Sequence, residues 1–382
     1  MHLGDDGAVH DMHDLIAIGL QHHDVMAGGV SGSGHRLHAD TVRSQSMLSR
    51  PGSGLLSTGM QQVLDRPFAF SEWMSLLPNE WTAEAAPIIA AYGMGLQGWD
   101  ASYAYASNAP GISQTVQAAS HGVYNADAIS QMGLYPALAN MIYRGDVKEA
   151  PTTAILNVQP ELLKAGQVGF QQETKQDDDV KTFGGDVPAE MLAIGKVAVN
   201  FTNVEAGAVT SGQQAHWKRE QQIIRSATGQ LTWHYGEQPY FTINTPGTQG
   251  IVGFAADSVH VLQDISIRTG NPFAVVILSS LDTSENIAES KRLLLTTLAR
   301  TRNTHMRYNE QGTELLEVGE APVLLEPVDL KLTFVKGEAF RVHILDHEGQ
   351  RSGHSFVADK FPLEIRGSQY QTLYYELERI EK

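Results

Sequence analysis

One glutamate stands among aromatic residues in a pattern that suits chemistry on a sugar. Glu72 follows a short apolar run, 68–70, and Trp73 comes directly after it. A second apolar stretch carries further aromatic and polar side chains, namely Trp99, Asp100 and Tyr103. A carboxylate beside aromatic rings at the end of a strand is typical of sites that cleave glycosidic bonds, because the flat C–H face of a sugar stacks on such rings.

Two short apolar strands with a helix between them predict a β–α–β unit of a parallel sheet. The strands cover 67–70 and 96–103, and the helix between them, 81–92, is rich in alanine. Reactive groups of parallel sheets lie at the carboxyl ends of the strands. Glu72 is therefore the candidate catalytic residue, and the candidate substrate-binding residues are Trp73, Asn79, Trp99, Asp100 and Tyr103.

Each of these residues also has a purely structural interpretation. Glu72 is alternatively a surface or capping carboxylate where a strand meets a loop. Asp100 is alternatively a helix cap or an ion-pair partner, and Tyr103 a plain core residue. The two tryptophans favour the functional interpretation, because cores rarely need such large rings at loop positions.

Composition restricts the class of protein and of partner. The 382 residues are 42% hydrophobic and 18% charged, which indicates a folded chain with room for two or three domains. The net charge of -16 argues against nucleic acid or an anionic membrane as partner. The absence of cysteine excludes disulfides, Cys-ligated zinc and thiol catalysis. No apolar run is long enough to span a membrane, and Met1–Asp6 does not read as a signal peptide, so the location stays open.

Two polar segments raise the question of a metal. Residues 1–45 are rich in His and Asp, the usual metal ligands, but their spacing fits no helical His-x-x-x-His pair with a placed acid, so we favour a solvated segment over a metal site. Asp177–Asp179 lacks the Gly and Glu that a calcium loop needs, which favours a solvated charge run. We expect no metal and no cofactor.

The rest of the chain predicts β structure. Residues 151–228 form a β-rich connecting region that includes a strand over 191–201. Residues 229–382 carry short strands at the spacing of a β-sandwich, beginning with a hairpin of 230–235 and 240–244. The predicted fold class is α/β plus all-β, with an α/β lobe over 1–150.

Four segments carry a resemblance to a known enzyme clan. They are Arg66–Trp73, Leu77–Glu84, Ala90–Gly93 and Leu96–Tyr103. They resemble the last two β/α units of retaining glycoside hydrolases of the (β/α)8-barrel clan with catalytic glutamates on strands 4 and 7, such as β-galactosidases and β-agarases. The resemblance implies that Glu72 is the strand-7 nucleophile and that Trp99 lies under the sugar.

The resemblance extends to the rest of the architecture and implies a substrate. Asn125–Asp146 is similar to the helix that closes such barrels, and the later strands are similar to their appended β-sandwich modules. The implied fold is the C-terminal part of a TIM-type barrel followed by one or two β-sandwich domains. The implied substrate is a poly- or oligosaccharide, such as the galactan agar, and relatives of this kind are usually secreted or periplasmic.

One departure from the clan pattern is serious. Retaining hydrolysis needs two carboxyl groups about 5–5.5 Å apart, and the clan places the acid/base after an Asn on strand 4. No Asn-Glu pair precedes Glu72, and residues 1–71 are too few for six β/α units. We therefore expect an incomplete enzyme that is inactive alone and that associates through its open sheet edge, with a second copy as one partner.

Three hypotheses remain at this stage. The first is a glycoside hydrolase whose active form needs the missing half. The second is a non-catalytic carbohydrate-binding or structural protein built on the β-sandwich. The third is a different α/β enzyme in which Glu72 is a general base. Nothing in the sequence separates one sugar or linkage from another.

Overall fold

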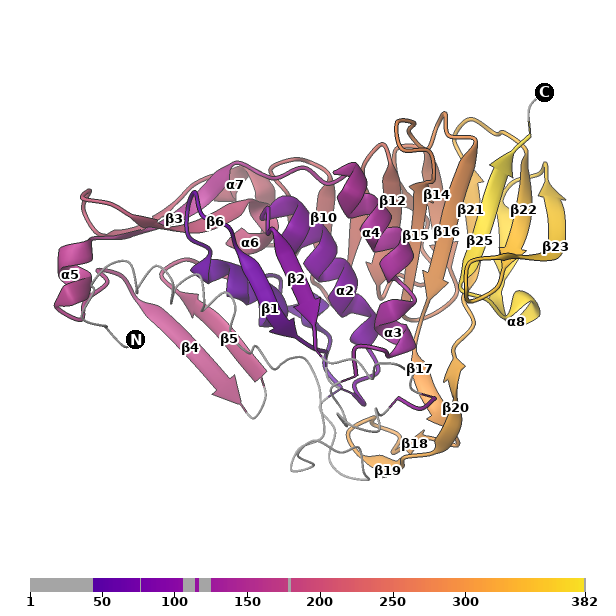
Figure 1. Cartoon of the computed structure of the whole chain (residues 1–382), viewed down its shortest axis with the longest axis horizontal. Helices are drawn as coiled ribbons and strands as arrows, with labels where there is room; N and C mark the ends of the chain where they lie inside the picture. Colours follow the sequence, from indigo (N-terminus) through magenta and orange to yellow (C-terminus); the bar gives the residue numbers. More distant parts are fainter. Residues whose placement is uncertain (1–43, 76, 106–113, 117–124, 178–179, 381–382) are drawn as a thin grey trace.

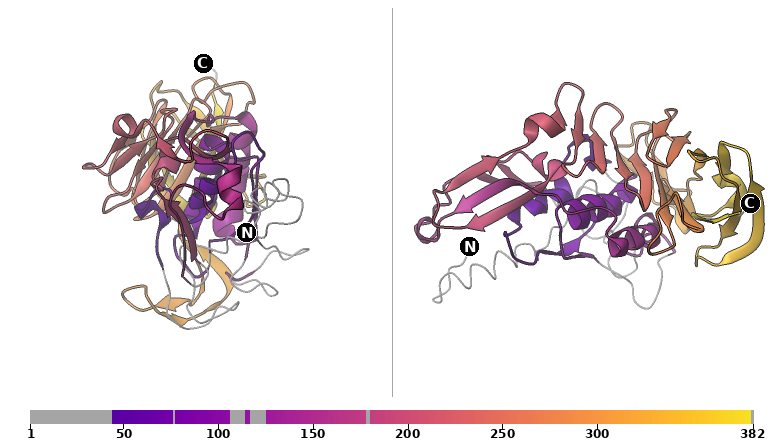
Figure 2. Two further views of the ribbon diagram at one scale, coloured as in Figure 1. Left: turned by 90° about the vertical axis from the view of Figure 1, so that its left-hand side faces the viewer. Right: turned by 90° about the horizontal axis from the view of Figure 1, so that it is seen from above.

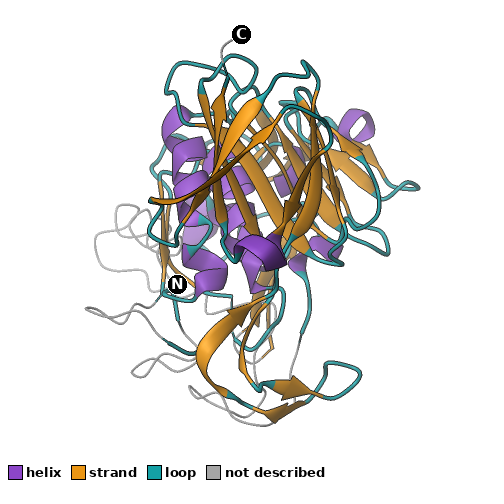
Figure 3. Ribbon diagram, turned by 90° about the vertical axis from the view of Figure 1, so that its right-hand side faces the viewer, coloured by secondary structure: helices purple, strands orange, loops and turns teal. Residues whose placement is uncertain are grey.

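The computed structural model describes residues 44–75, 77–105, 114–116, 125–177 and 180–380 (Figure 1). The molecule is elongated, with the C-terminal strands at one end and the strands β3 to β7 at the other (Figures 1 and 2). Helices lie along one side of the main sheet between these ends (Figure 3). The predicted His-rich segment lies outside the described residues, as does most of Asp177–Asp179. Among the described helices, none is long and apolar enough to cross a membrane.

The predicted order of strand, helix and parallel strand is confirmed, but the predicted strand over 96–103 is wrong in its first half, because the helix runs on to Leu96 and the strand begins only at Ala101. Strands β1 (Ala69–Trp73) and β2 (Ala101–Ala104) pair in parallel, with Phe70 opposite Ser102 and an irregularity before Trp73. The connection is one continuous helical segment made of η3 (Thr82–Glu84), α2 (Ala85–Ile88) and the π-helix η4 (Ile89–Leu96). Two further helices follow, α3 (Ile129–Met132) and α4 (Tyr135–Arg144). Helix α4 ends at Gly145, whose φ of 60° is readily adopted by glycine.

The all-β portion is also confirmed, and it centres on a sheet of ten described strands. Neighbouring strands in it are antiparallel, and the order is β23-β22-β25-β16-β15-β12-β11-β10-β9-β8. The predicted hairpin is its pair β10 and β11. The strand bounds are β8 Trp217–Lys218, β9 Ile223–Arg225, β10 Leu231–His234, β11 Tyr240–Asn244, β12 Thr248–Gly253, β15 Ala274–Ser280, β16 Arg292–Leu298, β22 Phe340–Leu345, β23 Arg351–Ala358 and β25 Tyr374–Arg379.

A smaller antiparallel sheet covers one face of the large one. Its strands are β13 (His260–Val261), β14 (Ile265–Thr269), β21 (Asp329–Phe334) and β24 (Leu363–Arg366). Alternating side chains of both sheets, such as Val276 and Leu332, share one buried core. This is the sandwich arrangement in which each inner face removes the other from water.

The opposite face of the large sheet packs against the helices. Tyr92 of η4 is fully buried, with its ring centroid 4.8 Å from that of Trp233 and 5.3 Å from that of Phe241. The same core continues from Leu48 to Tyr374. The α/β unit and the β-sandwich are therefore joined by one hydrophobic core.

The remaining strands form smaller sheets. β3 (Thr152–Val158) pairs in parallel with β6 (Lys196–Phe201) and antiparallel with β7 (Gly207–Thr210). β4 (Gln172–Asp177) and β5 (Val180–Gly185) form a hairpin. The other helices in the described part of the chain are η1 Met47–Ser49, η2 Gly54–Gln61, α5 Pro160–Lys164, α6 Met191–Ile194, α7 Gln213–His216 and α8 Gly367–Tyr370.

The predicted strand over 191–201 is wrong in its first half. Met191–Ile194 is helix α6, and the strand β6 begins only at Lys196. All four α6 residues are buried, so the run is apolar throughout and shows neither helical nor strand periodicity. Gly195, in extended backbone, separates the two elements.

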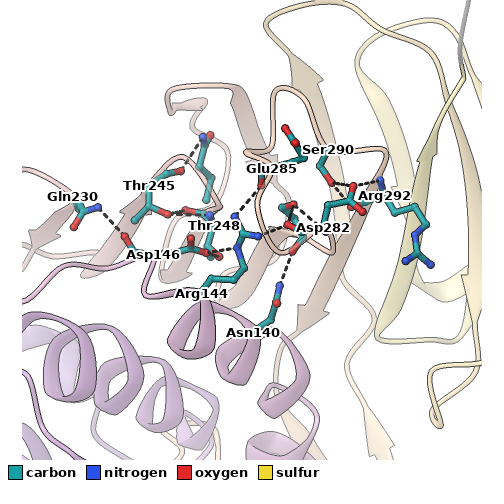
Figure 4. A network of polar contacts seen from close by, with 12 residues as sticks. Asn140, Arg144, Asp146, Gln230, Thr245, Thr248, Asp282, Glu285, Ser290 and Arg292 are labelled. Atoms are coloured by element: carbon teal, nitrogen blue, oxygen red, sulfur yellow. Dashed lines mark hydrogen bonds and ion pairs between the residues drawn. The ribbon is translucent and has the colours of Figure 1, made fainter.

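A polar network fastens the end of α4 to the β-sandwich (Figure 4). The Arg144 guanidinium donates to the backbone carbonyls of Asp282 and Glu285, and its Nε lies 3.2 Å from a carboxylate oxygen of Asp146. That carboxylate accepts a hydrogen bond of 2.8 Å from the Thr248 hydroxyl. The two charged groups are largely buried and paired with each other, as buried charges must be. The network fixes where α4 lies against the sheet.

Another buried carboxylate holds the first described residues against the α/β unit. Glu84 is fully buried and accepts hydrogen bonds from the Ser46 hydroxyl at 2.5 Å and the Met47 N–H at 2.6 Å. Burial raises the pKa of this carboxyl from 4.5 to about 8, against the opposing effect of the two hydrogen bonds. The folded protein therefore holds a proton here that the unfolded chain has already released at neutral pH.

We predict that Glu84 makes the protein less stable as the pH rises from about 4.5 to about 8, because only the unfolded state loses the proton in that window. In Glu84→Gln a neutral amide can accept from Met47 and donate to Ser46, so this dependence disappears. Urea unfolding at about pH 5 and about pH 9 should show a loss on the order of 4 kcal/mol in the parent protein. Glu161→Gln on exposed α5 is the control, and an unchanged pH dependence in Glu84→Gln would refute the assignment.

Candidate functional site at the carboxyl edge of β1 and β2

Glu72 is the last but one residue of β1, because that strand extends to Trp73, beyond the predicted strand over 67–70. The side chain is half-buried, and the arrows of β1 and β2 end at the same edge of the pair (Figure 1). The backbone pairing continues past the strands, since the Tyr105 N–H donates to the Trp73 carbonyl at 2.9 Å. Glu72 therefore belongs to the edge where parallel sheets carry their reactive groups.

A groove of about 500 Å³ runs beside β2, between that strand and the helices η4 and α4. Two predicted site residues line it together, Trp73 and Tyr103, the second of which is 60% exposed. Glu72 is not among the described residues of the lining. The lining side chains are mainly apolar: Trp73, Ala86, Ile89, Ala90, Met94, Ser102, Tyr103, Ala104, Ala126, Asp127, Met132, Tyr135, Leu138, Ala139 and Ile142.

The groove offers few polar groups. Burial raises the pKa of the Tyr135 hydroxyl to about 12, and the negative charge of Asp127 adds to this shift. The Tyr135 hydroxyl is therefore neutral at physiological pH. Among the described lining residues Asp127 is the single carboxylate, so the groove suits ligands that are largely apolar.

Trp99 lies in the core rather than at an open edge. Its side chain is 3% exposed, and its ring contacts those of Phe68 and Phe70 at centroid distances of 5.3 and 5.7 Å. Gly93 of η4 passes so close that a Cβ there would lie 2.6 Å from the Trp99 ring. Trp99 thus fills the space between β1 and the helix, and this packing alone accounts for a large ring at that position.

Asp100 and Asn79 are both engaged with the backbone. The Asp100 carboxylate accepts a hydrogen bond of 2.8 Å from the Phe68 N–H, just before β1 begins. Asn79 is buried, donates to the Gln45 carbonyl at 3.1 Å and accepts from the Trp81 N–H at 3.3 Å. The structure therefore gives both residues a role in holding the edge together. Their predicted contact with substrate stays a prediction.

An arm from the β-sandwich covers the loop that follows β1. The arm comprises β17 (Thr301–Thr304), β18 (Arg307–Tyr308), β19 (Leu315–Glu317) and β20 (Glu320–Leu325), and it projects beyond the large sheet (Figures 1 and 3). The Tyr308 hydroxyl donates to the Pro78 carbonyl at 2.9 Å. Met306 and Leu315 pack with Met74 and Leu77. The β-sandwich therefore packs, through this arm, against the loop that follows the Glu72 edge.

A charge cluster fixes the arm to this loop. Glu80, 9% exposed, accepts from the Arg302 Nε at 2.7 Å and lies 3.5 Å from an Arg300 guanidinium nitrogen. Arg300 also pairs with Glu326 at 2.6 Å. The sequence interpretation missed these residues. The spacing of Arg300 and Arg302 could have indicated the cluster. Side chains two residues apart in extended chain point to the same side, and two arginines there call for a nearby carboxylate.

No metal centre emerges from the described residues, which contain no group of three or more His, Cys, Asp or Glu that could hold an ion.

We predict that Trp99→Ala lowers the free energy of unfolding by about 3–5 kcal/mol, since it leaves a cavity in the core. Trp99→Phe should lose markedly less, because its smaller ring still contacts Phe68 and Phe70. Equilibrium unfolding in urea measures both. A Trp99→Ala protein as stable as the parent would place the ring outside the core.

We predict that Arg302→Ala destabilises the protein by about 1–3 kcal/mol, because the largely buried Glu80 loses its shortest ion pair. Arg307→Ala on the same arm is the matched control. Its pair with Glu317 is exposed on both sides and should be worth less than about 1 kcal/mol. Equal losses in the two variants, measured by denaturant unfolding, would argue against a special role of the Glu80 cluster.

Comparison of the chain with protein-family models, with curated proteins and with solved structures found no match. A function proposed for this chain therefore rests on the geometry of the β1–β2 edge and on the expectation, from the sequence alone, that 66–105 resembles retaining glycoside hydrolases.

Proposed function

We propose that this chain is the C-terminal part of a retaining glycoside hydrolase in which Glu72 is the nucleophile. The observation that carries the proposal is the position of Glu72 near the carboxyl end of β1, within a parallel β1–β2 pair. The elements that follow have the order that the resemblance implies. A helical connection leads to β2, helices α3 and α4 come next, and a β-sandwich ends the chain.

The chemistry assigns Glu72 one half of the reaction. Its carboxylate attacks the anomeric carbon and forms a glycosyl ester as the bond to the leaving oxygen breaks. A second carboxyl group protonates that oxygen and later activates the water that cleaves the ester. In the proposal this acid/base group comes from β/α units of the enzyme that are not among these 382 residues.

In the proposal these further units lie beside the β1–β2 pair. Within the described residues β1 and β2 form a two-stranded parallel sheet, whereas a whole barrel of this kind has eight parallel strands. The apolar groove beside β2 would cover the side chains of an added strand and its helix. A second copy of this chain is the other candidate for the same edge.

The substrate in this proposal is a neutral poly- or oligosaccharide. The net charge of -16 disfavours polyanions. A galactan such as agar follows from the resemblance.

One observation favours the alternative of a non-catalytic carbohydrate-binding protein. Trp99, which the resemblance places under the sugar, is 3% exposed and packed in the core. Under this alternative, glycan binding survives Glu72→Gln and depends on aromatic side chains of the β-sandwich.

The proposal is tested with aryl glycosides that carry a dinitrophenolate leaving group. Such a leaving group departs without an acid, so Glu72 alone can form the ester, and the ester persists because no base activates water. We predict that intact-mass spectrometry of the chain, incubated with a panel of these glycosides, shows one added glycosyl unit. Peptide mapping should locate it on Glu72.

Two variants decide the interpretation of this experiment. Glu72→Gln should show no adduct, whereas Glu161→Gln, which replaces an exposed carboxylate on α5, should label like the parent protein. An adduct that persists in Glu72→Gln, or its absence with every sugar of the panel, overturns the proposal. Binding of glycans without any adduct would support the non-catalytic alternative.

A further inference from the structure

A second place with the chemistry of a sugar site lies at the far edge of the ten-stranded sheet. Strand β8 ends the sheet on the side opposite β23, and the short helix α7 (Figure 1) leads into it. Beside them is a depression of about 370 Å³, within the roughly 300–1,000 Å³ of small-molecule sites. Its lining residues are Gln213, Gln214, Trp217, Arg219, Glu220 and Gln221.

The Trp217 ring is held in place before any ligand arrives. The side chain is half-buried and packs against the main hydrophobic core. Its indole Nε1 donates a hydrogen bond of 2.8 Å to the Tyr235 hydroxyl, and its backbone pairs with that of Ile224. A fixed ring loses little conformational freedom on binding, so the site is preorganised.

One face of the Trp217 ring stacks against a planar group, the guanidinium of Arg219. The Arg219 guanidinium carbon lies 3.9 Å from the centroid of the Trp217 ring, and the arginine itself is exposed. An exposed cation–π contact is weak and exchanges readily. The C–H face of a pyranose can take the place of the guanidinium, which then donates hydrogen bonds to the hydroxyl groups at the edge of the sugar.

The rim supplies both kinds of hydrogen-bonding group. The three glutamines each offer amide donors and a carbonyl acceptor, and Glu220 adds a carboxylate. Hydroxyl groups of a sugar need donors and acceptors together, and an apolar peptide segment would leave these rim groups unpaired. The positive charge of Arg219 is offset by Glu220, which disfavours an anionic ligand.

We propose that the Trp217 depression binds a unit of a neutral saccharide, stacked on the indole and hydrogen-bonded by the glutamines and Arg219. The site lies outside the Glu72 edge and takes no part in bond cleavage. The choice of saccharides among neutral polyhydroxylated ligands rests on the proposed function. Such a site would hold a polymer chain on the enzyme surface.

The test is isothermal titration of the full chain with a panel of neutral oligosaccharides, comprising agaro-, galacto-, gluco- and xylo-oligosaccharides. We predict that at least one binds and that Trp217→Ala weakens its binding by about tenfold or more. Trp217→Phe should retain part of the affinity, because a smaller aromatic face remains. Tyr143→Ala removes a 90% exposed aromatic ring from α4 and should bind like the parent protein.

Further variants keep the test decisive if Trp217→Ala does not fold. Gln214→Ala and Gln221→Ala change exposed rim residues only, and each should weaken binding by about threefold or more. Absence of binding to the whole panel, or unchanged affinity in the Trp217 and glutamine variants, overturns the proposal. Binding that is lost in Glu72→Gln but kept in Trp217→Ala would also overturn it. Binding at Trp217 without a glycosyl adduct on Glu72 would contradict the proposed hydrolase alone.

Discussion

The packing of η4 against the large sheet fixes the positions of β1, β2 and Glu72 at the candidate site. Tyr92 is fully buried against Trp233 and Phe241, and burying rings of this size is among the largest favourable terms available to a fold. Because η4 joins β1 to β2, fixing this helix on the sheet also fixes both strands. Glu72 is therefore held in place by the β-sandwich side of the molecule, even though β10 and β11 lie far from it in the sequence.

A parallel strand pair is rarely stable by itself, and its surroundings here show how much support it needs. Trp99 fills the space between β1 and η4, and the Asp100 carboxylate ties the start of β1 to the end of that connection. Gln97 fastens the same region to the segment 192–197 through three buried hydrogen bonds. Several side chains that the sequence suggested as substrate contacts thus stabilise the strand pair. The same polar groups can form hydrogen bonds with the backbone or with a sugar, so the sequence does not separate the two roles.

Local patterns predicted the elements well and the contacts between distant segments poorly. The β–α–β unit and the hairpin β10–β11 each follow from residues that are neighbours in the chain, so their patterns were visible. The helix over Met191–Ile194 could not be predicted in this way, because all four residues are buried and the run therefore shows no alternation of apolar and polar residues. The pair of Glu80 and Arg302 spans 222 positions, and nothing near either residue indicates its partner. The role of Trp99 could not be predicted from the sequence either, because a large ring at a strand end is equally compatible with stacking on a sugar and with packing in the core.

The groove beside β2 and the depression at Trp217 differ in their polar lining, and this decides what each can hold. A sugar placed in the groove would exchange water for apolar side chains, and each hydroxyl left unpaired costs about 1–3 kcal/mol. Apolar side chains of a polypeptide avoid this cost, because they bring no hydroxyl groups into the groove. At Trp217 the amides of the rim replace the water that a sugar loses. In our two proposals the partner polypeptide and the saccharide therefore occupy different surfaces of the chain.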